Sequence, residues 1–328
     1  MRILFFTPYF SQSRGNTTTA KRIVQSLCEL NVQVTVYSYL ENELWTDNFA
    51  EYDLIHILHA TRFAIWAQKH GVLLTKPYLI TMGGTDINVD LSENLDPTVY
   101  QLLDRASYIT VFTEDAKQKV RRLLPSWERK THVISQTPWM SQSLNAQVAF
   151  NTPLLLLPAG LRPVKDVLHP LSALDQLTSD YPSLKYTIIG ANLEDQVYQQ
   201  IQHTGLTRPW LTYEGVIPFH EMPKWYSQYN IVVNTSISEG QSLALMEAMA
   251  IGKPVLARRN EANTSLIQHG LTGWLYETMD EFISSIHVIM TNSSLRQQVI
   301  DNAQKSMLVS PIEEAKKYHH LYQLTIRS

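Results

Sequence analysis

The chain has 328 residues with 27 Lys and Arg against 30 Asp and Glu, a formal net charge of −3. A chain of this length exceeds what one hydrophobic core usually serves, so two domains of about 150 residues each are expected. The charge balance gives no basic field for phosphates, and no Lys and Arg cluster lies beside a set of aromatic residues. These features argue against a nucleic-acid-binding protein.

The chain begins with an apolar run, Ile3 to Phe6, which Pro8 and polar residues end too early for a signal peptide. We therefore predict a strand there. No apolar stretch approaches the roughly 20 residues that cross a bilayer, so the sequence predicts a cytoplasmic protein without a transmembrane segment. The single cysteine, Cys28, lies in an apolar helical stretch and is predicted to be buried.

Short apolar runs alternate with stretches of helical periodicity in the first half of the chain, which is typical of parallel α/β architecture. The predicted strands are Ile3 to Thr7, Val32 to Tyr37, Leu54 to Ile57, Tyr78 to Met82, Tyr108 to Phe112 and His132 to Ser135. The segment from Gln136 to Thr152 loses the alternation and is predicted to connect two domains.

The alternation restarts after this segment. The predicted strands are Leu154 to Leu157, Tyr186 to Ile189, Leu211 to Tyr213, Ile231 to Asn234, Pro254 to Ala257 and Trp274 to Leu275. We expect two doubly wound domains, 1–140 and 141–310, and a helix at 311–328 that packs back across the domains. Ligands of such sheets lie beyond the carboxyl ends of the strands, so two facing domains would share a cleft.

The segment from Ile231 to Ala257 carries the clearest sign of chemistry. A buried strand leads into a loop with Glu239 and Gly240, and a helix follows from Ser242. Ser242 is a good N-cap, and Gly240 allows a ligand close to the backbone. The N–H groups that would face an anion at this helix end are those of Gln241, Ser242 and Leu243. The pattern predicts a seat for a diphosphate.

Two carboxylates accompany the predicted helix, Glu239 in the loop before it and Glu247 inside it. They would reach different parts of one ligand, one accepting bonds from sugar hydroxyls and the other from ribose hydroxyls. The same spacing fits a plain strand-loop-helix unit in which Glu239 is a cap and Glu247 a surface charge. The residues alone leave both interpretations open.

The stretch EGQSLALMEAMAIGKPV resembles the E-x7-E segment of the family 4, or group 1, retaining glycosyltransferases, and QHGLTGWLY continues the likeness. The sequence is also similar, over nearly its whole length, to the glycosyltransferase 1 domain-containing protein 1 group. That likeness rests on segments of the form G-N-x-x-T-A-x-R, G-G-T-D and G-L-R-x-V-K-D. The resemblance implies the GT-B fold, with two facing Rossmann-like domains, and a metal-independent hexosyltransferase.

The resemblance also assigns roles in the second domain. Arg162 and Lys165 would neutralise the donor diphosphate, although both also fit a solvated turn. Glu239 would hold sugar hydroxyls and Glu247 the ribose. The remaining nucleotide-side positions are Gly190, at a strand-end turn, and Ile217, in a segment whose backbone touches the base in family members.

The first domain would supply the acceptor side. Gly15 and Asn16 would close the cleft near the donor phosphate, or simply begin a helix with threonine caps. Many family members have a His-Gly pair after the fourth strand, and Met82 occupies that His slot here. The residues that keep this loop recognisable are Gly83, Gly84 and Asp86. His56 and His59 resemble positions near the cleft, or are structural.

The sequence therefore predicts transfer of a sugar from a nucleotide-sugar donor, first UDP-N-acetylglucosamine or UDP-glucose, to an acceptor that it does not identify. Neither a cofactor nor a metal is expected. Two alternatives stay open: a nucleotide-sugar epimerase or hydrolase of the same fold, and a non-catalytic nucleotide-sugar binding protein. Met82 in the His slot keeps the second alternative open.

Overall fold

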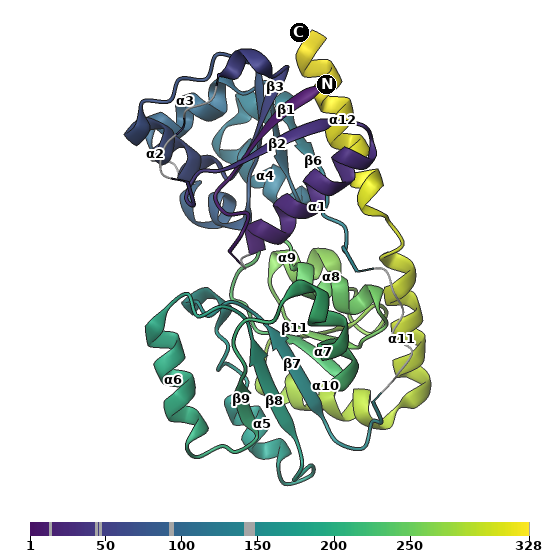
Figure 1. Ribbon diagram of the computed structural model, residues 1–328. Helices are drawn as coiled ribbons and strands as arrows, with labels where there is room; N and C mark the ends of the chain where they lie inside the picture. The colour runs from purple at the N-terminus through teal and green to yellow at the C-terminus, as the bar shows by residue number, and fades with distance from the viewer. Residues whose placement is uncertain (13–14, 43–44, 46–47, 92–94, 141–147, 328) are drawn as a thin grey trace. The chain divides into compact units, whose positions relative to one another are not determined.

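The computed structural model describes residues 1–327 except 13–14, 43–44, 46–47, 92–94 and 141–147, and the chain divides into two units (Figure 1). The first unit comprises Met1–Thr137 and Val309–Ser328, and the second comprises Pro138–Leu308. Part of the predicted connection, 141–147, lies outside the described residues. Each unit is a parallel sheet with helices against its faces (Figure 1).

The first sheet has six parallel strands in the order β2-β1-β3-β4-β5-β6. Its strands are β1 (Arg2–Thr7), β2 (Gln33–Ser38), β3 (Leu54–Leu58), β4 (Tyr78–Thr81), β5 (Tyr108–Val111) and β6 (Thr131–Val133). Its helices are α1 (Gly15–Glu29), α2 (Ala60–His70), α3 (Pro97–Arg105), α4 (Glu114–Leu123) and α12 (Pro311–Arg327), with short helices η1 (Phe49–Glu51), η2 (Asp86–Asp90) and η3 (Pro125–Lys130). The strand order reverses between β1 and β3, which is the switch point of this sheet.

The second sheet has the order β12-β11-β10-β7-β8-β9. Its strands are β7 (Leu154–Pro158), β8 (Lys185–Ile189), β9 (Leu211–Tyr213), β10 (Ile231–Asn234), β11 (Val255–Arg258) and β12 (Trp274–Tyr276). Its helices are α5 (Leu171–Leu177), α6 (Asp195–Gly205), α7 (Met222–Gln228), α8 (Leu243–Ala250), α9 (Glu261–Leu266), α10 (Met279–Thr291) and α11 (Ser293–Ser306), with η4 (Pro163–Lys165) and η5 (Phe219–Glu221). The switch point lies between β7 and β10.

Burial on both faces explains why the strands read as continuous apolar runs. Successive strand residues point to opposite faces, so Leu4 and Phe6 enter one core of the first unit while Ile3 and Phe5 enter another. The twelve predicted strands all occur, with small shifts at their ends.

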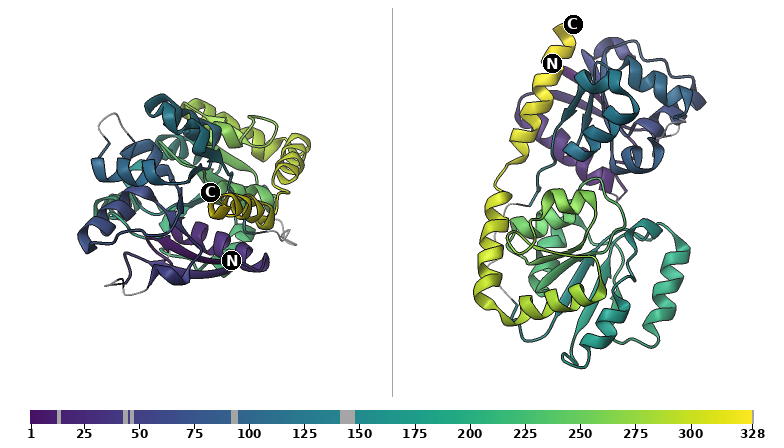
Figure 2. Two further views of the ribbon diagram at one scale, coloured as in Figure 1. Left: turned by 90° about the horizontal axis from the view of Figure 1, so that it is seen from above. Right: turned by 180° about the vertical axis from the view of Figure 1, so that it is seen from behind.

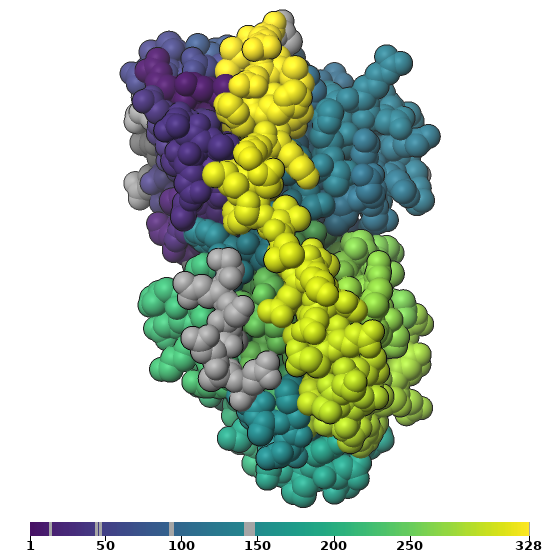
Figure 3. Space-filling view, turned by 90° about the vertical axis from the view of Figure 1, so that its right-hand side faces the viewer, coloured from purple at the N-terminus to yellow at the C-terminus, as the bar shows by residue number. Residues whose placement is uncertain are grey.

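The C-terminal helix α12 belongs to the first unit, where it packs against α1, β3 and β4 (Figures 2 and 3). Tyr318 and Tyr322 enter the core beneath it. A fully buried ion pair, Arg22 Nε to Glu314 Oε2 at 2.9 Å, joins α1 to α12. The hydroxyl and N–H of Thr137 donate to the same carboxylate at 2.7 and 3.0 Å. The helix is thus held by polar contacts as well as by apolar packing.

One prediction about α1 was wrong, since Cys28 is exposed. The buried stripe of the helix passes through Ala20, Ile23 and Leu27, and Cys28 lies just outside it. None of the helices in the described ranges is both long and apolar enough to cross a membrane.

Candidate functional site

The loops that follow β7 and β10 are joined at the switch point of the second sheet. Ile237 N–H donates to the Val164 carbonyl at 2.9 Å, and the Thr235 hydroxyl donates to the Lys165 carbonyl at 2.7 Å. Ligands of doubly wound sheets bind at this point, beyond the carboxyl ends of the strands. The predicted donor-site residues of both loops therefore lie where such sheets bind ligands.

Lys165 and Glu239 form an ion pair in these loops. Lys165 Nζ lies 2.5 Å from Glu239 Oε1, and the two side chains are only 15% and 10% exposed. Ser236 Oγ and Asn234 Nδ2 donate to the same oxygen at 2.7 and 3.1 Å. Burial alone would raise the pKa of Glu239, but the Lys165 charge and these three hydrogen bonds outweigh burial and lower it. Glu239 is therefore an ionised carboxylate held in one place, not a helix cap.

Three asparagines that sequence reasoning missed brace this loop. The side-chain oxygen of Asn234, Oδ1, accepts from Ser236 N–H at 3.1 Å and from Asn263 Nδ2 at 3.0 Å, and Asn263 is fully buried. Asn260 Nδ2 donates to the Ser236 carbonyl at 2.9 Å. Asn234 ends β10, and the other two follow β11. Their position after neighbouring strands was the available signal.

Arg162 shares the turn of Lys165, because it is the residue that precedes η4. Its side chain is partly buried. Asp166 ends the turn in the left-handed region, at φ 42°, and accepts from Arg258 Nη1 at 2.7 Å. Arg258, at the end of β11, was also missed by sequence reasoning. The structure thus brings three cationic side chains to the loops at this sheet edge.

The N-terminus of α8 follows Glu239 directly. Ser242 is the N-cap, as predicted, and its hydroxyl accepts from Leu245 N–H. Gly240 and Gln241 lie between Glu239 and this cap, and Leu243 is the first residue of α8; all three are partly buried. Backbone N–H groups at such a helix end favour negative charge.

Glu247 is not a surface charge, because it is only 6% exposed inside α8. The hydroxyl of Tyr226 donates to its Oε2 at 3.3 Å. Burial, and then the Glu247 charge, raise the pKa of that tyrosine well above its usual value.

Gly190 has a structural reason to be glycine. Its φ is 142°, and a Cβ at this position would lie 2.2 Å from the Ala159 carbonyl oxygen. Its N–H donates to the Gly215 carbonyl at 2.7 Å, so it lets the chain segments after β7, β8 and β9 meet. Ile217, in the segment after β9, is half-buried against the core of the second unit.

In the first unit, Gly15 and Asn16 are the first residues of α1. A Cβ at Gly15 would meet no atom of the residues that the structure describes within 4 Å, so their packing does not require glycine there. Before α1, Glu41 accepts the N–H groups of Phe10, Ser11 and Gln12 at 2.8 to 3.1 Å. Burial would raise the pKa of Glu41, but these backbone hydrogen bonds lower it.

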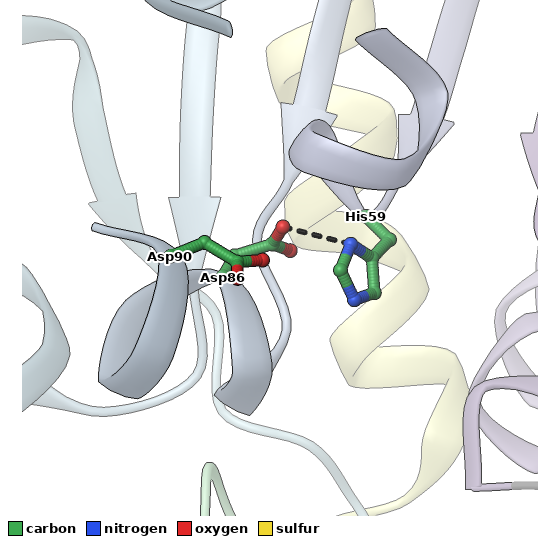
Figure 4. Close-up of side chains that lie close together, drawn as sticks. All are labelled: His59, Asp86 and Asp90. Carbon is green, nitrogen blue, oxygen red and sulfur yellow. Dashed lines mark ion pairs between the residues drawn. The ribbon is translucent and has the colours of Figure 1, made fainter. Parts of the chain in front are cut away.

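The loop after β4 places Asp86 beside His59. Met82, in the predicted His slot, is 2% exposed and packs into the apolar core, so it offers the loop no polar group. Asp86 accepts Gly83 N–H at 2.7 Å, and His59 Nδ1 lies 2.8 Å from its Oδ1 (Figure 4). Gly84, partly buried, begins the helical turn that carries Asp86.

Burial alone would raise the pKa of Asp86, but the His59 charge and hydrogen bonds from His59, Gly83 and Thr61 lower it. Asp90 lies next to this pair, and the donor atoms of His59, Asp86 and Asp90 are within 4.8 Å of one another. By chemistry and spacing, these three could share a metal ion.

His56 has a structural role instead. It is fully buried, with Nδ1 2.6 Å from the Tyr322 hydroxyl and Nε2 2.7 Å from the Thr81 hydroxyl. Burial lowers its pKa to about 3. Its ring is therefore neutral and joins α12 to the sheet.

Comparison with known proteins identifies the family of the chain. Residues 144–306 match the family model of the glycosyl transferases group 1. The chain is 28% identical over 330 residues to glycosyltransferase 1 domain-containing protein 1 of Xenopus tropicalis, covering 93% of this chain and 92% of that protein.

Solved structures share the fold. Anabaena Alr3699/HepE in complex with UDP-glucose matches with a TM-score of 0.77 at 17% identity, over 99% of this chain and 100% of that one. Sucrose-phosphate synthase from Thermosynechococcus elongatus matches with a TM-score of 0.77 at 16% identity, over 100% of both chains. These likenesses confirm the predicted GT-B fold class. With the E-x7-E segment, the family match and the relatives in agreement, the chain belongs to the group 1 glycosyltransferases.

Proposed function

We propose that this glycosyltransferase takes a sugar from a UDP-sugar and transfers it, with retention of anomeric configuration and without a metal ion, to an acceptor. The observation that supports this most is the Lys165–Glu239 ion pair at the switch point of the second sheet, one turn from Arg162. A cation at this position suits the diphosphate of a nucleotide sugar, and a carboxylate suits the hydroxyl groups of its sugar.

Negative charge builds on the nucleoside diphosphate as its bond to the sugar breaks. Arg162, Lys165 and the N–H groups at the start of α8 would stabilise that charge, since charge-assisted hydrogen bonds strengthen as the acceptor becomes more anionic. The leaving phosphate would take the acceptor's proton on the same face of the sugar. The side chains of this site would then need only to bind the donor and to stabilise the charge on the leaving diphosphate, and no protein nucleophile is required.

Glu239 would accept hydrogen bonds from sugar hydroxyls, while Glu247 would bind the ribose. Lys165 pairs with Glu239 in the structure. A diphosphate would compete for Lys165 and leave the Glu239 carboxylate to the sugar. Donor binding would therefore rearrange the ion pair, with Ser236 and Asn234 keeping the carboxylate in position.

Solved structures of similar fold support a UDP-sugar donor. Alr3699/HepE has been solved with UDP and with UDP-glucose, and the pneumococcal O-GlcNAc transferase GtfA with UDP and GlcNAc. UDP-glucose and UDP-N-acetylglucosamine are therefore the first donors to test.

The test is a thermal-shift screen of nucleotide sugars, followed by mass spectrometry of acceptor mixtures incubated with the best donor. We expect UDP release that depends on an acceptor and a product heavier by one sugar, with its anomeric configuration read by NMR. UDP release without an acceptor would indicate a hydrolase. Thermal stabilisation without turnover would indicate a binding protein.

A further inference from the structure

The turn that carries Lys165 lies between two buried apolar residues, Leu161 and Val167. Leu161 N–H donates at 2.8 Å to a carbonyl that follows β8, and the Val167 carbonyl accepts from the Tyr186 hydroxyl at 2.8 Å. Both ends of the turn are therefore fixed to β8 or to the chain just after it. The direction in which Lys165 points then depends on residues 162–166 between these ends.

Asp166 closes this turn in a conformation that is uncommon for a residue with a Cβ. Its backbone lies in the left-handed region, at φ 42° and ψ 48°, which aspartate adopts more readily than most residues. Its N–H donates to the Pro163 carbonyl at 3.0 Å, and its carbonyl accepts from His169 N–H at 2.9 Å. Glycine would satisfy the same backbone without a side chain. The backbone of the turn therefore does not by itself require aspartate.

The side chain of Asp166 is held by Arg258, from the end of β11. Arg258 Nη1 donates to Asp166 Oδ2 at 2.7 Å and to the Thr235 carbonyl at 3.5 Å. The Asp166 and Arg258 side chains are 35% and 26% exposed, and an ion pair this exposed contributes little to global stability. A contact that fixes a turn beside a binding site can still change the rate, because a displacement of about 1 Å can cost about 10² in turnover.

The loop after β10 holds the same turn through its backbone. The Val164 carbonyl accepts from Ile237 N–H at 2.9 Å, and the Lys165 carbonyl accepts from the Thr235 hydroxyl at 2.7 Å. With the Asp166 carboxylate, three successive residues of the turn are held from the ends of two neighbouring strands, β10 and β11. A turn held in this way presents its lysine in one direction before a ligand binds.

We propose that Asp166 and Arg258 are positioning residues of the donor site, whose ion pair fixes the direction of the Lys165 side chain. The inference rests on the proposed function, because it concerns the lysine assigned there to the donor diphosphate. The other role open to Arg258 is that of a third cation on the diphosphate. Its contacts favour the positioning role, since one nitrogen of its guanidinium already donates to the Asp166 carboxylate and the Thr235 carbonyl.

The experiment measures turnover and UDP affinity in Asp166→Gly and Arg258→Gln, each alone and in a Lys165→Ala background. Glycine keeps the left-handed backbone and removes the carboxylate. We expect turnover to fall on the order of tenfold to 10² in each single variant, and UDP affinity to fall less. In the Lys165→Ala background the same substitutions should change turnover less than about twofold, because a residue that acts through Lys165 has no further effect once that lysine is gone.

Arg208→Gln is the matched control. Arg208 pairs with Asp175 at 2.8 Å in the same unit, and this pair has an exposure similar to that of Asp166 and Arg258. The control should leave turnover and UDP affinity unchanged. The melting temperatures of Arg208→Gln and Arg258→Gln should both stay near that of the wild type, because exposed ion pairs contribute little to stability.

His169 reports on the ion pair without any ligand. Its Nδ1 lies 3.3 Å from Asp166 Oδ2. Burial, and then the Arg258 charge, lower the pKa of His169, while the Asp166 charge raises it. In an NMR titration of the imidazole signals, with His169→Gln to identify this ring, Arg258→Gln should raise the pKa of His169. Asp166→Asn, which keeps the volume of the side chain, should lower it further.

Three results would overturn the proposal. The first is wild-type turnover in Asp166→Gly, which would show that the backbone of the turn suffices. The second is a loss of turnover in Arg258→Gln that is as large in the Lys165→Ala background as in the wild type, which would show that Arg258 does not act through Lys165. The third is a pKa of His169 that neither substitution changes, which would show that the ion pair does not form in solution. Failure of the proposed function would appear separately, as a wild-type protein that neither binds UDP nor transfers a sugar.

Discussion

One oxygen of Glu239 accepts three hydrogen bonds, from Lys165, Ser236 and Asn234. Arg162 and Arg258 lie at the same edge of the sheet. These donors keep the carboxylate ionised and immobile before a ligand arrives. A binding group fixed in advance loses little freedom when the substrate binds.

Glu239→Gln should lower turnover by about 10² or more while UDP affinity stays near that of the wild type. In the proposed site its contact would be to the sugar and would strengthen as positive charge develops on the ring. Steady-state kinetics and calorimetry with UDP measure the two effects. Glu194→Gln, an exposed carboxylate that makes no cap bond in the same unit, should be neutral. Equal losses of UDP affinity and of rate in Glu239→Gln would place this residue on the nucleotide instead.

At the scale of elements, α12 depends on a buried charge pair. Glu314→Ala would leave Arg22 uncompensated in a site that is 0% exposed, so unfolding free energy should fall by about 3–5 kcal/mol. Glu313→Ala is the matched control, because its pair with Lys316 is about half exposed and should contribute less than about 0.5 kcal/mol. Urea unfolding followed by circular dichroism compares them. Similar losses for both variants would contradict the account of how this helix is held.

His56 makes the docking of α12 pH-dependent. Burial lowers its pKa from 6.5 to about 3. Between these two pH values His56 is therefore protonated in the unfolded chain but not in the folded chain. Its contribution is therefore complete above pH 6.5 and is lost as the pH falls from there toward 3. Between pH 7 and pH 5 the loss should be about 2 kcal/mol. Urea unfolding of His56→Gln should show a smaller loss of unfolding free energy between pH 7 and pH 5 than the wild type. An equal loss in both proteins would exclude His56 as the source of this pH dependence.

The elements were predictable from the sequence because the central strands of each parallel sheet are buried on both faces and read as apolar runs. The Lys165–Glu239 contact was not, since these residues are 74 positions apart and meet only through the order of the strands. The same holds for Asn263 in α9, whose partner Asn234 ends β10, 29 positions earlier. Cys28 was misjudged because one exposed position can border a buried stripe. His56 and His59 read alike in sequence, and only the structure shows that His56 has a partner on each ring nitrogen while His59 lies beside Asp86.

At the scale of the whole molecule, both units place polar side chains at the switch point of their own sheet. Lys165 and Glu239 follow β7 and β10, and His59 follows β3. In the proposed donor site, Arg162 and Lys165 would supply the positive charges that a diphosphate needs. We therefore expect sugar transfer to survive dialysis against EDTA at its full rate. Loss of transfer in EDTA, restored by Mg²⁺ or Mn²⁺, would contradict this account of the diphosphate site.

The most direct test of the donor site is the kinetics of Arg162→Ala, Lys165→Ala and the double variant with a UDP-sugar. Each single substitution should lower turnover by about 10² to 10³ and donor affinity by less, because the contact strengthens as the leaving group gains charge. The double variant should be little worse than the poorer single variant, since both side chains would serve one phosphate group in the proposed site. Lys224→Ala, an exposed lysine of the same unit, should be neutral. Wild-type transfer rates in Arg162→Ala and Lys165→Ala would contradict the assignment of this loop to the donor diphosphate.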